Sequence, residues 1–204
     1  DDNEQRKSVD SAVFANLVWP LGGGFSIEGG GRLFRDVIED LRTTGGQAFA
    51  RDVRRTGLTP SAAFSWRPRA GRIFYLRYGS AFRQGGIGLS GTGQPQAVSG
   101  DELATIEAGW RAQLARGGAL DLSIYHTTWD DVQSDMPLPS GLIETRNVGR
   151  ALIRGLEASL DLPLDGRWHM STGLAVQDAQ LIRNETGLPL DDRRLPIVPE
   201  YTLR

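Results

Sequence analysis

Four glycines recur along this chain at an almost constant interval. They lie 47, 47 and 48 residues apart, each at the end of a short turn-forming segment, at Gly24, Gly71, Gly118 and Gly166. On each side of every segment, a run of about ten residues alternates apolar and polar side chains. Such alternation predicts β-strands, because successive side chains of a strand point to opposite faces of the sheet. We therefore expect an all-β, antiparallel chain built from long hairpins.

The alternation predicts about eight strands and the start of a ninth. The expected strands span about residues 10–19, 25–37, 59–67, 72–83, 101–115, 119–133, 145–162 and 167–181, and the ninth begins at Tyr201. Between them, opposite the glycine turns, lie longer polar connections that contain Gly and Pro, at about residues 38–56, 84–100, 134–144 and 182–198. The hairpins should thus have short turns at one end and long loops at the other.

Three features favour a transmembrane barrel segment over a soluble sandwich. The strands exceed the five or six residues that are usual in soluble proteins. The two sets of connections are very unequal in length, as in outer-membrane barrels, whose short turns are periplasmic and whose long loops are extracellular. Large amphipathic aromatic residues lie toward strand ends, as interfacial girdles require, at Trp19, Trp66, Tyr78 and Trp168.

Composition excludes several other classes of function. The 23 basic and 25 acidic residues nearly balance, which gives no electrostatic reason to expect a nucleic-acid partner. The chain has no Cys, which removes disulfide scaffolds, cysteine metal sites and thiol chemistry. We interpret the acidic residues Asp130, Asp131 and Asp135 as a solvated rim rather than a metal site. No catalytic, cofactor-binding or metal-binding residues are therefore expected, and we do not expect an enzyme.

Six short segments between residues 59 and 202 follow one another in a fixed order. They are TPSAAFSWRP at 59–68, YGSAFRQGG at 78–86, IEAGWR at 106–111, YHTTWDDVQ at 125–133, NVGRALIRGLE at 147–157 and LPIVPEYT at 195–202. In this order they resemble the barrel domain of TonB-dependent outer-membrane receptors. The segment at 147–157 is the most specific, because it follows the family pattern N-x-G-x-A-x-x-x-G-x-E in full. Residues 1–58 match only in alternation and loop rhythm.

The resemblance implies a function that the residues alone do not. Members of this family take up scarce nutrients such as ferric siderophores across the outer membrane of Gram-negative bacteria, driven by TonB. The implied partners are outer-membrane lipid, a plug domain of the same full-length chain, the TonB complex through an N-terminal region missing here, and a small ligand. Residues 1–204 would be part of the barrel domain, without plug or signal peptide.

Charged residues on the strands are the candidates for contact with ligand or plug. By strand parity we expect six to face the lumen, namely Arg77, Arg83, Glu107, Arg111, Arg154 and Glu157. The arginines could attract an anionic chelate, but we favour the simpler interpretation that these charges pair with one another or with the plug. The strand glycines Gly109, Gly149 and Gly155 are interpreted as places where strands bend or neighbours approach closely.

Two rival interpretations remain open from the sequence. One is a small eight-stranded outer-membrane barrel, complete in itself, with a structural or adhesive role. The other is a secreted all-β binding module. The module predicts that Phe64, Trp66, Phe74 and Leu76 are buried against protein, whereas the barrel predicts that they face lipid.

Overall fold

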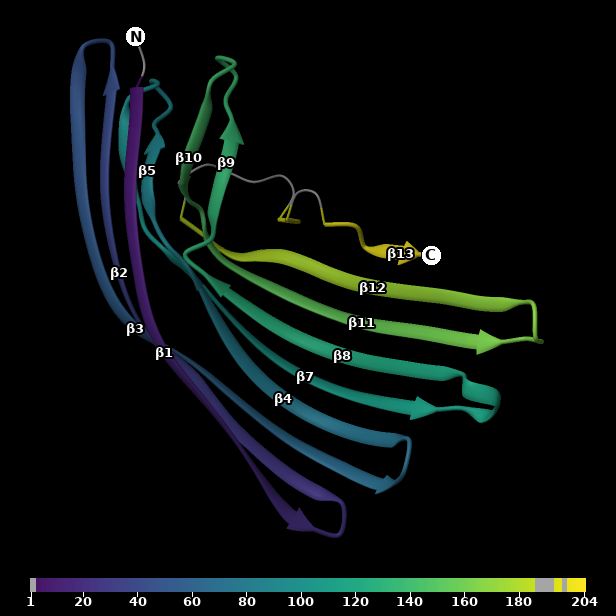
Figure 1. The fold of residues 1–204 in the computed structure, drawn as a ribbon. Helices are drawn as coiled ribbons and strands as arrows, with labels where there is room; N and C mark the ends of the chain where they lie inside the picture. Colours follow the sequence, from purple (N-terminus) through teal and green to yellow (C-terminus); the bar gives the residue numbers. More distant parts are fainter. Residues whose placement is uncertain (1–2, 186–192, 196–197) are drawn as a thin grey trace.

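The computed structural model describes residues 3–185, 193–195 and 198–204 and shows a single large antiparallel sheet (Figure 1). Nine strands form this sheet in the order β1-β2-β3-β4-β7-β8-β11-β12-β13. Their bounds are β1 Asn3–Gly22, β2 Phe25–Thr44, β3 Gln47–Arg69, β4 Arg72–Arg83, β7 Asp101–Gln113, β8 Ala119–Asp130, β11 Gly149–Pro163, β12 His169–Asn184 and β13 Tyr201–Leu203. The predicted eight strands and the start of a ninth are confirmed. The sheet is open, because β1 and β13 lie at its two edges.

Two of the expected long loops form small hairpins of their own. The hairpin β5 (Gly86–Leu89) and β6 (Pro95–Val98) leaves the main sheet after β4. The hairpin β9 (Gln133–Pro137) and β10 (Ile143–Asn147) leaves it after β8. Both hairpins lie at the same end of the main sheet, which we call the long-hairpin end (Figure 1). Most of the fourth expected loop, 182–198, lies outside the described residues.

The prediction of a loop over residues 38–56 is wrong. There β2 and β3 continue as one hairpin, paired without a register shift from Phe25↔Trp66 to Thr44↔Gln47. A tight turn closes this hairpin at Gly45 and Gly46, whose φ angles are 58° and 81°. The residues are charged, but they still alternate in exposure along β3, which keeps the strand two-faced beyond the apolar region.

The short turns lie together at the opposite end, which we call the short-turn end (Figure 1). Gly24 and Gly71 adopt the left-handed backbone that glycine tolerates, with φ of 82° and 74°. In the third turn, part of the 3-10 segment η1 (Ala115–Gly117), the left-handed glycine is Gly117. The fourth turn is held by the Asp165 carboxylate, which accepts the backbone N–H groups of residues 167 and 168 at 2.8 and 3.1 Å.

The sheet has one polar and one apolar face, and the apolar face is exposed. Phe64, Trp66, Phe74 and Leu76 are 43%, 38%, 39% and 51% exposed, so they are not buried in a protein core. Register brings four aromatic rings into one row across β2, β3, β4 and β7, stacked with centroids 5.6–5.8 Å apart, in the order Phe25, Trp66, Phe74 and Trp110. This aromatic row lies beside the short turns. Within the described residues, no helix is long and apolar enough to span a membrane.

Candidate functional site

A hollow of about 510 Å³ lies on the polar face. It crosses β4, β7, β8, β11, β12 and β13, so the sheet is concave on this side. Charged and hydroxyl side chains that alternate with the apolar face line it, among them Tyr75, Arg77, Glu107, Arg111, Asp121 and Glu157. Four of the six charged residues predicted to face a lumen therefore meet at one hollow.

The charges in this hollow pair across neighbouring strands. Glu107 is nearly buried and binds the Arg77 guanidinium at 2.6 Å. The Tyr75 hydroxyl donates a second hydrogen bond to the same carboxylate, also at 2.6 Å. Arg111 pairs with Asp121 at 2.6 Å and lies over the Tyr75 ring, 5.2 Å from its centroid. The result is a fixed ladder of alternating charges rather than a free cationic surface.

Glu157 and Arg154 differ from this pattern. Glu157 lines the hollow, is exposed, and has no hydrogen bond or ion pair to any described residue. The expectation that Arg154 shares its face is wrong, because the two positions differ by an odd number of residues on a regular strand. Register instead places Arg154 beside His126 and Asp178, on the apolar face that carries Leu156.

Two glycines in the middle of strands accommodate tyrosine rings from the neighbouring strand. A Cβ atom at Gly109 would lie 2.3 Å from the Tyr75 ring, and one at Gly155 would lie 2.4 Å from the Tyr125 ring. The Tyr125 hydroxyl donates to Gln177 of β12 at 2.8 Å, across Gly155 of β11. These contacts agree with the interpretation of both glycines as points of close approach. Neither tyrosine was among the predicted site residues, although each is the register partner of its glycine.

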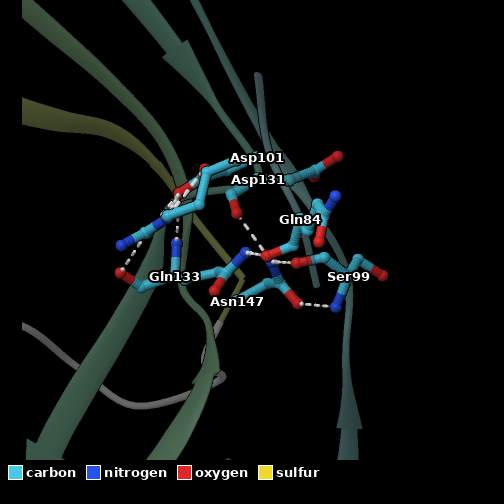
Figure 2. Close-up of polar contacts among 7 residues, drawn as sticks. Gln84, Ser99, Asp101, Asp131, Gln133 and Asn147 are labelled. Carbon is cyan, nitrogen blue, oxygen red and sulfur yellow. Dashed lines mark hydrogen bonds and ion pairs between the residues drawn. The ribbon is translucent and has the colours of Figure 1, made fainter. Parts of the chain in front are cut away.

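A second polar cluster holds the long-hairpin end together (Figure 2). Its centre is the Asp101 carboxylate, which is fully buried and lies against the Arg83 guanidinium, with Nε at 3.0 and 3.1 Å from its two oxygens. The same carboxylate accepts the backbone N–H of Gln133 at 3.2 Å. Arg83, the fifth predicted lumen residue, is therefore a partner of this buried acid at the point where β4, β7 and β9 meet.

Asn147 joins the two small hairpins within this cluster (Figure 2). Its amide oxygen accepts the backbone N–H of Ser99 at 2.8 Å, and its amide nitrogen donates to the Ser99 carbonyl at 3.1 Å. The same nitrogen donates to the Asp131 carbonyl at 2.6 Å. Asp131 has a left-handed φ of 54°, so this bond holds a strained turn. Sequence reasoning identified the segment 147–157 but not the part that its first residue plays.

Two of the three acidic residues near this cluster bind different partners. Asp130 pairs with Arg150 at 2.8 Å, and Asp135 accepts a hydrogen bond from the Thr145 hydroxyl at 2.6 Å. Among the described residues, no three His, Cys, Asp or Glu side chains are grouped so that they could hold a metal ion. The described residues of the site thus form a polar, ion-paired wall.

An antiparallel sheet with long strands, an exposed apolar face and a polar hollow is the architecture of a membrane β-barrel wall. The family model "TonB dependent receptor-like, beta-barrel" matches residues 1–204, the whole chain. The chain belongs to this family. Its members are transport receptors. No curated protein matches the sequence.

Solved structures with the same fold include receptors for metal chelates. The ferric yersiniabactin uptake receptor FyuA from Yersinia pestis superposes with a TM-score of 0.76 at 17% identity, over 99% of this chain and 31% of that one. The siderophore receptor PiuA from Acinetobacter baumannii superposes with a TM-score of 0.77 at 16% identity, over 98% of this chain and 31% of that one. The copper transporter OprC superposes with a TM-score of 0.73 at 20% identity, over 93% of this chain and 30% of that one. The chain thus spans about a third of the length of these structures.

Proposed function

We propose that this chain forms part of the wall of an outer-membrane receptor that takes up a scarce nutrient, such as a ferric siderophore, with energy delivered by TonB. The observation that carries the proposal is the exposed apolar face with its aromatic row at one end. Lipid is the environment in which such a face is stable, because water contact with so much contiguous apolar surface is unfavourable. Family membership and the siderophore and copper receptors of like fold support the choice of cargo class.

The same geometry supports an orientation. In outer-membrane barrels the short turns face the periplasm and the long connections face outward. The aromatic row would then lie at the periplasmic interface, and the paired hairpins β5-β6 and β9-β10 would stand above the outer surface. The secreted binding module is disfavoured, because its predicted core residues are exposed. The small closed barrel is disfavoured because, among the residues that the structure describes, β1 and β13 each pair with one strand of the sheet.

The polar hollow would face the interior of the barrel and contact the plug domain. Arg77 and Arg111 are already neutralised by carboxylates, so they offer little net charge to an anionic chelate. Glu157 is the carboxylate in the hollow with no partner among the described residues. A basic side chain of the plug is the complementary group for it, since a carboxylate held against a low-dielectric wall gains most from an opposite charge.

Uptake by the complete receptor tests the proposal. A strain that lacks the gene should lose energy-dependent accumulation of at least one iron-labelled siderophore from a panel, and the cloned gene should restore it. A proton uncoupler should abolish the uptake but leave surface binding intact. Normal uptake of every iron and copper chelate in the deletion strain would contradict the proposed cargo class, and a receptor missing from purified outer membranes would contradict the location.

A further inference from the structure

Two neighbouring arginines at the long-hairpin end of the apolar face have no partner in the described part of the chain. Arg35 on β2 and Arg54 on β3 are exposed, and neither has a hydrogen bond or ion pair to a described residue. Arginines on the polar face of the same hairpins behave differently. Arg32 binds both oxygens of Asp10 at 2.6 and 2.7 Å, for example. Arg32 is therefore neutralised on the polar face, whereas Arg35 and Arg54 remain available on the apolar face.

Register brings the two arginines together. Arg35 is directly opposite Ser11 on β1 and Thr56 on β3, and Arg54 is two residues from Thr56 on the same strand face. Diagonal neighbours of this kind have Cα atoms about 7–8 Å apart. Two guanidinium groups and two hydroxyls thus lie close together on this face. The next outward row away from the short turns holds Asp52 and Glu39, and Glu39 pairs with Lys7.

This group adjoins the edge of the apolar surface. The next outward row toward the short turns is Val13, Leu33 and Leu58, which are 74%, 56% and 62% exposed. Arg35 follows Phe25 of the aromatic row by ten residues, which is about 33 Å along a strand. At the roughly 45° tilt of barrel strands this is about 23 Å of height, close to the 25 Å or so of an apolar band. The arginines therefore lie at the border opposite the aromatic row.

We propose that Arg35 and Arg54, with the hydroxyls of Ser11 and Thr56, bind the phosphate groups of the phosphorylated glycolipid in the outer leaflet. A guanidinium group can donate two parallel hydrogen bonds to the oxygens of one phosphate. Such bonds are strong at an interface from which water is partly excluded. The acyl chains of the same lipid would cover Val13, Leu33 and Leu58. This inference rests on the proposed function, because it requires the outer-membrane location.

Lipid binding by the complete receptor tests this site. The receptor is purified in detergent, titrated with purified lipopolysaccharide, and bound glycolipid is counted by native mass spectrometry. We expect the double variant Arg35→Gln/Arg54→Gln to bind about thirtyfold more weakly, since each arginine at an anionic surface contributes about fivefold. Arg72→Gln is the matched control, because Arg72 is exposed on the same face but lies beside a short turn. The Arg72→Gln receptor should bind the glycolipid as tightly as the unmodified receptor.

Several results would overturn the proposal. They are unchanged binding by the double variant, an equal loss in Arg72→Gln, or complete displacement of the glycolipid by millimolar inorganic phosphate. If the double variant does not assemble, the unmodified receptor decides the question, because phosphatase-treated lipopolysaccharide should then bind at least tenfold more weakly and equal binding would refute the site. Failure of the proposed function would be seen separately. The receptor would then be absent from the outer membrane, or the deletion strain would still take up every chelate.

Discussion

At the residue scale, the contacts between glycines and tyrosines explain why small residues stand in the middle of long strands. A strand glycine ordinarily weakens a sheet, because it has no side chain to pack and loses more backbone entropy on folding. Here the Tyr75 ring lies across Gly109 and the Tyr125 ring lies across Gly155, so each ring covers backbone that a side chain would otherwise cover. Both hydroxyls then reach polar partners on the concave face.

Adding a single methyl group at such a glycine should destabilise the barrel. We expect Gly109→Ala to lower the free energy of unfolding by about 1–3 kcal/mol, because the new Cβ overlaps the Tyr75 ring and forces it off its bond to Glu107. Gly79→Ala is the control, since nothing lies within 4 Å of its Cβ position. Urea unfolding of the receptor in lipid vesicles measures both, and equal effects would contradict the ring contact as the cause. The double variant Gly109→Ala/Tyr75→Ala should lose the clash.

Sequence reasoning was most successful where one residue at a time alternates between two environments. It predicted the four short connections, the strand count and the face of Arg77, Glu107 and Arg111, since period-two patterns fix all of these. It failed at Arg154, whose face was assigned together with Glu157 although the two have opposite parity. It also failed at 38–56, where charged residues suggested a loop and only the pairing with a partner strand shows the hairpin.

At the scale of elements, the long-hairpin end is braced by side chains that bind backbone. Asn147 connects the hairpins β5-β6 and β9-β10 through Ser99 and Asp131. From the other side, the Arg51 guanidinium of β3 donates to the carbonyl of Val98 at 2.9 Å and to that of Gly86. The β5-β6 hairpin is thus held between the tall β2-β3 hairpin and the β9-β10 hairpin. These partners are distant in sequence, so no local pattern could have predicted them.

Removing the Asn147 amide should release the two small hairpins from each other. We expect Asn147→Ala to increase amide hydrogen exchange over residues 84–100 and 131–147, because three hydrogen bonds are lost and each contributes about 0.5–1.5 kcal/mol. Exchange at the short-turn end should not change. Asn16→Ala is a suitable control, since Asn16 makes one exposed bond to Glu28 on β1-β2. Faster exchange of both ends alike would indicate general destabilisation instead.

At the scale of the whole molecule, the exposed apolar face is what requires a membrane. Leu76 lies on it, 51% exposed, in the outward row next to the aromatic row. Leu76→Arg should destabilise the membrane-embedded receptor by an amount between the roughly 0–1 kcal/mol of a charge at the interface and the roughly 2–4 kcal/mol of one at the midplane, because Leu76 lies one row inside the aromatic row. Gly79→Arg places the same charge on the polar face, where the position is open, and should be tolerated. Equal tolerance of both in folding assays would argue against lipid contact.

A second prediction at this scale concerns the concave face and its unpartnered carboxylate. If Glu157 pairs with a basic group of the plug, Glu157→Gln should loosen the plug and make the complete receptor more permeable to small antibiotics. Ser159→Ala, on the same face of β11, should have little effect. Antibiotic sensitivity of strains with equal receptor levels is the measurement. Unchanged sensitivity of the Glu157→Gln strain would remove Glu157 from the plug contact.

The strand order determines whether the sheet stays continuous when the chain is cut in a connection. Every neighbour in the order β1-β2-β3-β4-β7-β8-β11-β12-β13 is also the next large strand along the chain. The β5-β6 hairpin is therefore a detour, and β4 and β7 on either side of it are joined by twelve paired positions. A protease that cuts the turn around Gly93 would divide the covalent chain without dividing the sheet. An epitope tag or a split reporter could therefore be inserted in this turn and still leave the sheet continuous.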